Sequence, residues 1–176
     1  MNRKKYLPEF VYGSMDGTVT TFAVVAGAIG AELSSAVVLI LGFANLFADG
    51  FSMAISNYLS AKSNYELQHP KFSKTICYVA DKCPKKSALA TFISFILVGF
   101  LPLLSFVTAI FVPAISSSKF LLSFILTAVA LFVVGFVKGQ VVQKNSWKAA
   151  TETLTIGGLA AVIAYLVGFF LKSIAR

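Results

Sequence analysis

Five stretches of this 176-residue sequence are apolar over about 20 residues each, which is the length that an α-helix needs to cross a hydrocarbon core of about 30 Å. They cover residues 10–31, 33–60, 87–110, 120–138 and 150–171. A hydrophobic content of 57% and a mean hydropathy of +0.83 exceed what a soluble domain of this length carries. The sequence therefore predicts an all-α integral membrane bundle of five transmembrane helices, forming one domain over residues 1–176.

The basic residues indicate how this bundle is oriented. The formal net charge is +8, and twelve of the fifteen Lys and Arg residues fall on one side of a five-crossing plan. They are Arg3, Lys4, Lys5, Lys62, Lys71, Lys74, Lys82, Lys85, Lys86, Lys138, Lys144 and Lys148. The positive-inside rule explains this charge without nucleic acid, which we do not expect as a partner. It puts the N-terminus and the 61–86 connection in the cytoplasm and the C-terminus outside.

Two carboxylates interrupt the first two apolar stretches. A charge at the centre of a bilayer costs roughly 2.5 to 3.5 kcal/mol on insertion scales, so it usually faces a bundle interior or a watery path. Asp16 shares one helical face with Thr20, four residues later, and with Glu9, seven residues earlier. Asp49 occupies a similar place in the second stretch. Both acids indicate a transport function.

The second stretch carries side chains that suit a transition metal. Asp49, Met53 and Asn57 follow one another at intervals of four residues and share a face of the predicted helix. Carboxylate and amide oxygens suit hard or borderline cations, whereas a thioether favours softer ones. This mixture fits ferrous iron. Glu152 opens the fifth stretch, where it either interacts with the helix dipole or serves as a vestibule or proton-handling acid.

Enzymatic signatures are missing from the sequence. It has no GxSxG, HExxH, P-loop or dinucleotide-binding motif, and its single histidine, His69, leaves little for acid–base catalysis. Cys77 and Cys83 lie in the predicted cytoplasmic connection, where thiols normally stay reduced, and their spacing matches no zinc or redox motif. We therefore do not expect an enzyme, or a resident cofactor.

Long motifs in the sequence resemble the vacuolar iron transporter family. They are YGSMDGTVTTFAVVAGAIGA at residues 12–31, ANLFADGFSMAISNYLSAKS at residues 44–63, and VKGQ followed by ETLTIGGLAAVIAYLVG in residues 137–168. The resemblance implies a homodimer of five-helix protomers in the lipid bilayer. Such a dimer moves ferrous iron, or manganese, out of the cytosol in exchange for protons. The chain would be a multi-pass protein, in the cell membrane if its source is prokaryotic.

The resemblance also implies functional residues. The acid of the DG motif, here Asp16, and the methionine of the SMA motif, here Met53, are metal-pathway residues in that family. Glu9, Asp49, Asn57 and Glu152 are further candidates for the metal pathway or for proton coupling. We expect Asp16 and Met53 of two protomers to form one shared metal site.

One departure from the family concerns the 61–86 connection. Family members carry a Glu-rich cytoplasmic domain there that collects metal, whereas this short basic connection has only Glu66 and Asp81 as acids. As a hypothesis, His69, Cys77 and Cys83 form a minimal capture site. The alternative is an ordinary amphipathic connection.

Two other functions remain open at this stage. The acids could pair with Lys or with backbone donors and hold together a membrane assembly that transports nothing. The chain could also be a proton-linked carrier of another small solute.

Overall fold

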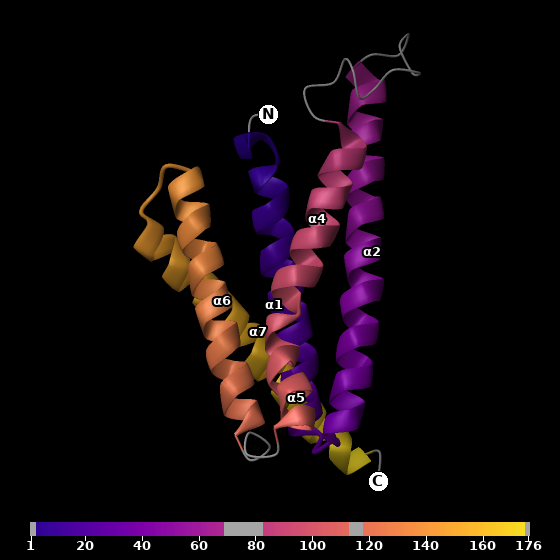
Figure 1. Ribbon diagram of the computed structural model, residues 1–176, viewed down its shortest axis with the longest axis vertical. Coiled ribbons are helices and arrows are strands. Elements are labelled where there is room, and N and C mark those ends of the chain that lie inside the picture. Colours follow the sequence, from indigo (N-terminus) through magenta and orange to yellow (C-terminus); the bar gives the residue numbers. More distant parts are fainter. Residues whose placement is uncertain (1–2, 69–82, 113–117, 175–176) are drawn as a thin grey trace.

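All described secondary structure of the chain is helical, as predicted. The computed structural model describes residues 3–68, 83–112 and 118–174. These residues form a short 3-10 helix and six α-helices (Figure 1). They are η1 (Arg3–Tyr6), α1 (Leu7–Gly30), α2 (Ser35–Gln68), α4 (Pro84–Gly99), α5 (Leu101–Phe111), α6 (Lys119–Val141) and α7 (Ser146–Ile174).

Three of these helices, α2, α6 and α7, are long and apolar enough to cross a membrane. The successive helices α4 and α5 qualify together as a fourth, bent crossing. The 24-residue α1 is outside this set, because acids and hydroxyl residues interrupt its apolar run. The chain is therefore a multi-pass membrane protein, while the five crossings and the side of each terminus stay predictions.

A bend divides the third predicted crossing. Helices α4 and α5 meet at Phe100 with an angle of 47°. Pro102 lies in the first turn of α5, and it has no backbone N–H to continue the α4 hydrogen-bond ladder. The hydroxyl of Ser123 in α6 donates to the Pro102 carbonyl at 2.7 Å, which fixes the bent segment to its neighbour. The proline at this position accounts for the bend.

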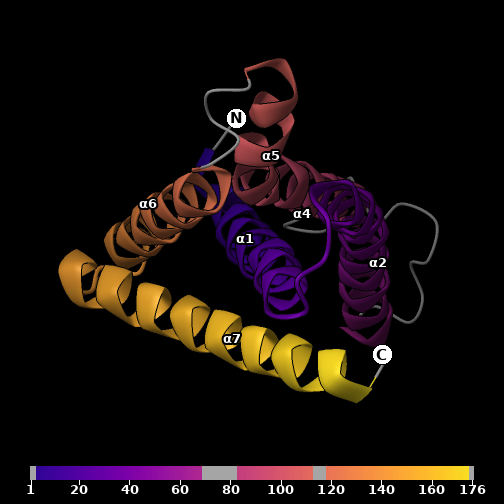
Figure 2. The same ribbon diagram turned by 90° about the horizontal axis from the view of Figure 1, so that it is seen from below.

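Helix α1 runs through the middle of the bundle and contacts all five other α-helices (Figure 2). Small residues allow this close packing. A Cβ added to Gly13 or Gly17 would lie 2.5 Å from the carbonyl oxygen of Thr91 or Phe95 in α4. Ser14, Thr18 and Thr21 of α1 are fully buried. The Thr18 hydroxyl donates to the Ser14 carbonyl at 2.7 Å, so α1 buries polar side chains against its neighbours.

The apolar core lies between α1, α2 and the bent pair α4–α5. Its fully buried side chains include Val25, Leu46, Phe95, Leu103 and Phe106. On the outside, α7 presents large apolar side chains such as Phe169 and Phe170 to the surroundings. A bilayer is the solvent that such a surface requires.

Helix α2 is longer than the sequence predicted. The apolar stretch ends near residue 60, but the helix continues to Gln68. Lys62 and Glu66, one helical turn apart, form an ion pair at 3.7 Å, and Tyr65 is buried. These contacts support two further turns after the apolar residues have ended.

The start of α1 and the end of α7 lie at opposite ends of the bundle (Figure 1). The end of α2, the start of α4 and the connection from α6 to α7 lie at the same end as the start of α1. We call this the basic end, because seven lysines with described side chains cluster there, against two at the other end. They are Lys5, Lys62, Lys85, Lys86, Lys138, Lys144 and Lys148, against Lys119 and Lys172.

Candidate functional site

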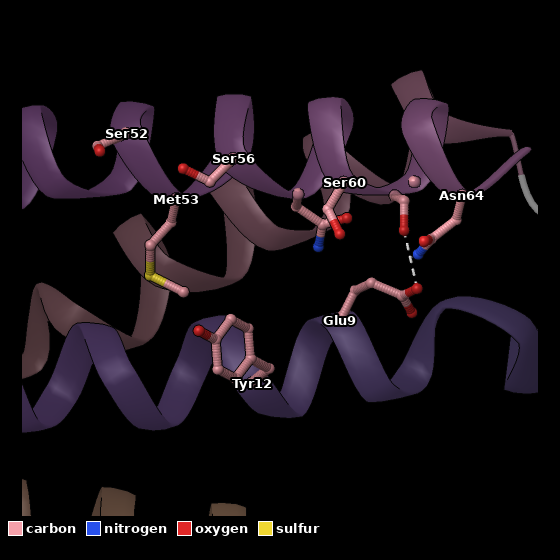
Figure 3. Close-up of a pocket in the computed structure, with 10 residues that line it drawn as sticks. Glu9, Tyr12, Ser52, Met53, Ser56, Ser60 and Asn64 are labelled. Atoms are coloured by element: carbon pink, nitrogen blue, oxygen red, sulfur yellow. Dashed lines mark hydrogen bonds between the residues drawn. The ribbon is translucent and has the colours of Figure 1, made fainter. Parts of the chain in front are cut away.

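A polar cavity of about 560 Å³ opens between α1, α2 and the first turn of α4 (Figure 3). It lies toward the basic end of the bundle, where α1 begins. Its lining consists mainly of hydroxyl and amide side chains, with one carboxylate and one thioether. The residues are Glu9, Tyr12, Ser52, Met53, Ser56, Asn57, Ser60, Ala61, Asn64 and Ser87. Eight of the ten lining residues carry a side-chain oxygen, so the cavity can admit water and offers oxygen ligands to a cation.

Glu9 enters the cavity from the first turn of α1, where the helix dipole favours a negative charge. The hydroxyl of Ser87 in α4 donates to Glu9 Oε1 at 2.8 Å. Close by, the backbone N–H of Cys83 donates to the Tyr6 hydroxyl at 3.2 Å. These two bonds hold the start of α1 against the start of α4 and orient Glu9, the only acid among the described residues that line the cavity.

Asn57 is held by α4 in a similar way. Its Nδ2 donates to Thr91 Oγ1 at 2.8 Å, and the Thr91 hydroxyl donates to the Ser87 carbonyl at 3.1 Å. Because the amide nitrogen bonds to Thr91, the oxygen is the atom that Asn57 retains for another partner. An amide oxygen can bind a cation.

Met53 lies one helical turn below Asn57, deeper in the bundle. Its thioether projects from α2 toward α1, as does Asn64 nearer the opening, and Glu9 and Tyr12 face them from α1 (Figure 3). Met53 also packs against the apolar core. The side chain therefore lies where the cavity meets the core, with its sulfur accessible from the polar side.

Asp16 and Asp49 lie one turn deeper still, below Tyr12 on α1 and below Met53 on α2. Both are half-buried, and Asp16 is close enough to Asp49 to experience its charge. Neither residue lines the cavity itself. Two carboxylates in such a position repel each other unless a proton or a cation lies with them.

Polar groups continue around the acid pair. The Thr20 hydroxyl donates to the Asp16 carbonyl at 2.8 Å, which places a hydroxyl one turn beyond the acid on α1. Asn45, one turn before Asp49, has its Nδ2 buried without a hydrogen-bond partner in the described part of the chain. The Asn45 amide therefore keeps a hydrogen-bond donor in the polar surroundings of the two acids.

The remaining predicted residues lie apart from this cavity. Glu152 is exposed in the second turn of α7, where its carboxylate pairs with Lys138 at 4.0 Å.

His69 and Cys77 lie outside the described residues. Cys83, expected as a reduced thiol, is disulfide-bonded at the start of α4. In this oxidised form it has no thiolate to offer a metal. Within residues 3–68, 83–112 and 118–174, no three His, Cys, Asp or Glu side chains converge as a metal site.

The sequence of this chain matches a known protein family. A sequence model of the VIT family matches residues 7–82 and 77–169, which together are most of the chain. The protein belongs to the VIT family. The match covers α1, α2 and α4, the helices that form the cavity.

Three curated relatives of this VIT-family chain are named vacuolar iron transporters. The protein from Toxoplasma gondii is 29% identical over 95% of this chain and 74% of its own length. The one from Plasmodium berghei is 25% identical over 97% of this chain and 84% of its own. Vacuolar iron transporter 1 of Eucalyptus grandis is 26% identical over 89% of this chain and 83% of its own.

The same comparisons show a difference in length. The alignment with the Toxoplasma gondii protein runs over 225 positions, more than the 176 residues of this VIT-family chain. The family-model match is made in two pieces that meet at residues 77–82, in the connection between α2 and α4. Relatives thus have residues without a counterpart here, and the family pattern is interrupted at this connection.

The sequence reasoning missed several residues that line the cavity. Ser52, Ser56 and Ser60 follow one another at intervals of four on α2, so their common face was readable from the sequence. Ser87 and Thr91 carried no such signal, because only the packing of α4 on α1 and α2 brings them to Glu9 and Asn57.

We predict that the cavity face of α2 is wet and its opposite face is not. In a Cys77→Ser/Cys83→Ser background, Ser52→Cys should react with a charged maleimide about tenfold faster than Phe51→Cys. The two positions are neighbours at the same depth, and both are exposed, but only Ser52 lines the cavity. A thiol in hydrocarbon does not ionise, so Phe51→Cys should react slowly. Equal labelling rates at the two positions, measured in membranes whose two sides are both open to the maleimide, would contradict the aqueous cavity.

Proposed function

We propose that this protein exports a divalent transition metal, ferrous iron or manganese, from the cytosol in exchange for protons. The passage runs between α1 and α2. The observation that carries this proposal is the acid pair Asp16 and Asp49 below a polar cavity that reaches Met53. The names of the relatives, vacuolar iron transporters, support iron as the substrate.

The side chains along this passage favour a transition metal over magnesium or calcium. Glu9, Asn57 and the acid pair offer oxygen ligands, and Met53 adds a thioether. Oxygen ligands alone would suit the hard alkaline-earth cations, which bind thioethers poorly. A mixed set of oxygen and sulfur suits Fe²⁺ and related ions of intermediate softness. Met53 is thus the residue that sets the class of metal.

The direction of transport rests on the distribution of charge. The cavity opens near the basic end of the bundle, and lysines gather on the cytoplasmic side of membrane proteins. We therefore place the cavity and the N-terminus in the cytoplasm and the C-terminus outside. Five crossings, with α1 as the most polar one, are consistent with the start of α1 and the end of α7 lying at opposite ends (Figure 1). The membrane is the cell membrane if the source is prokaryotic.

A second copy of the chain would complete the metal site. One protomer brings together two carboxylates and one thioether, whereas transition metals in proteins commonly take four to six ligands. The cavity is bordered by exposed serines on α2, Ser52, Ser56 and Ser60, rather than by another helix. A two-fold axis along this face would double the ligands from Asp16 and Met53 and enclose the passage.

Proton exchange follows from competition for the same oxygens. A protonated carboxylic acid no longer attracts a cation, so a proton that arrives from outside displaces the metal from the acid pair. Loss of that proton to the cytosol prepares the site for the next metal ion. Asp16 and Asp49 carry this exchange in our proposal.

The short connection between α2 and α4 changes how metal is delivered. It is too short and too basic to rebuild a Glu-rich collecting domain, and residues 1–176 form a single membrane domain in our proposal. Metal then enters the cavity directly from the cytosol. Glu9 is the first carboxylate that it meets, because it lines the cavity near the start of α1.

We predict that Asp16→Asn abolishes metal flux while the matched variant Glu152→Gln retains it. Both substitutions remove one acid, but Glu152 is exposed and outside the cavity. Flux of Fe²⁺ and Mn²⁺ is measured in proteoliposomes loaded with a metal-sensitive dye. We expect Asp16→Asn to lose at least about tenfold in rate, a loss corresponding to about 1.4 kcal/mol. Unchanged flux in Asp16→Asn, with normal folding in detergent, would refute the role of Asp16.

We also predict that flux depends on a pH gradient of defined sign. Metal transport should accelerate when the side that receives the metal is acidic, because protons there displace the metal from the carboxylates. An ionophore that collapses the gradient should remove the acceleration. Equal metal fluxes with pH gradients of either sign would show a carrier without proton coupling. If another solute drives proton movement and Fe²⁺ does not, that solute is favoured as the substrate.

A further inference from the structure

A second concave surface lies on the outside of α2 and α4. It is a groove of about 390 Å³, separate from the polar cavity. Its walls are apolar, with Phe51 and Ile55 from α2 facing Leu89 and Phe92 from α4. Its polar side chains are Tyr58 and Lys85. A long apolar channel with a cation beside it matches the shape and charge of an amphiphile.

The groove and the cavity use opposite faces of α2. Each residue of an α-helix turns by about 100°, so nine residues make about two and a half turns. Two side chains nine positions apart therefore point to opposite sides of the helix. Phe51 of the groove and Ser60 of the cavity are nine positions apart, as are Ile55 and Asn64. A partner protomer that covers the cavity face therefore leaves the groove open to lipid.

The polar side chains of the groove lie at the level of the lipid headgroups. About 20 residues of helix cross the hydrocarbon core, so α2, which starts at Ser35, leaves it near Ala54. Tyr58 comes one turn later, and Lys85 lies in the first turn of α4 at the same end. Phe51 and Phe92 are deeper, beside the acyl chains.

The charge of Lys85 is available to a ligand. This side chain is exposed and makes no ion pair within the described part of the chain. Lys62, one turn beyond Tyr58, is instead paired with Glu66 at 3.7 Å. Among the residues that the structure describes, no carboxylate lines the groove, so no described side chain there repels an anion.

We propose that the groove between α2 and α4 binds one anionic phospholipid, with an acyl chain along Phe51, Ile55, Leu89 and Phe92 and the phosphate on Lys85. Charge selects the headgroup, since each lysine near an anionic membrane surface contributes to lipid affinity. The Tyr58 hydroxyl is an additional hydrogen-bond donor at the headgroup level. This site is independent of the metal passage and does not require the proposed transport function.

Lipid retention by the purified protein tests this proposal. The protein is reconstituted in nanodiscs of equal parts phosphatidylglycerol and phosphatidylcholine, extracted in mild detergent, and analysed by native mass spectrometry. We expect preferential retention of phosphatidylglycerol, reduced about fivefold in Lys85→Gln and unchanged in Lys148→Gln. Lys148 is a matched control, because it is a lysine at the same end of the bundle but outside the groove.

Three outcomes would overturn the proposal. Phosphatidylcholine could be retained as well as phosphatidylglycerol, or the two lysine variants could lose lipid equally. The third concerns Ala88→Phe, which narrows the groove from α4 and should reduce lipid retention while leaving the oligomeric state unchanged. A changed oligomeric state in that variant would assign the groove to a second copy of the chain.

Discussion

Two carboxylates set into apolar helices impose the constraint on which the rest of this structure depends. Asp16 and Asp49 are half-buried on the contacting helices α1 and α2. A bilayer tolerates such a pair only where water, a proton or a cation compensates it. The polar cavity meets this requirement from the basic end, because it brings hydroxyl, amide and carboxylate groups to Met53, one turn from Asp49. The cavity thus ends one turn of α2 short of Asp49, and in our proposal the metal ion passes Met53 to reach the two acids.

The position of α1 follows from the same constraint. A helix that carries Glu9 and Asp16 is too polar to face lipid, and it lies in the middle of the bundle with every other α-helix in contact (Figure 2). Glycines permit the close approach of α4, and hydroxyl side chains bond to backbone carbonyls within the helix. The more apolar helices α6 and α7 occupy the outside. The arrangement thus separates a polar inner helix from an apolar outer surface.

The helices and the polar faces of α1 and α2 could be predicted from the sequence, because hydropathy and helical periodicity depend only on residues that are close together in the chain. The apolar stretches correspond to the observed helices within a few residues, Pro102 marks the bend, and the polar faces of α1 and α2 follow from spacings of four and seven. The continuation of α2 to Gln68 escaped this reasoning, since hydropathy falls before the helix ends. The contributions of Ser87 and Thr91 also escaped it, because they depend on how α4 packs. The disulfide at Cys83 contradicts an expectation drawn from the compartment alone.

The position of a bound metal tests the central claim most directly. Crystals grown with Mn²⁺ give an anomalous signal that locates the ion without assumptions about its ligands. The account predicts a peak between α1 and α2, within bonding distance of the Asp16 carboxylates and the Met53 sulfurs of two protomers on a two-fold axis. A peak confined to the protein surface, with Asp16 and Met53 turned away from each other and no metal between them, would contradict it.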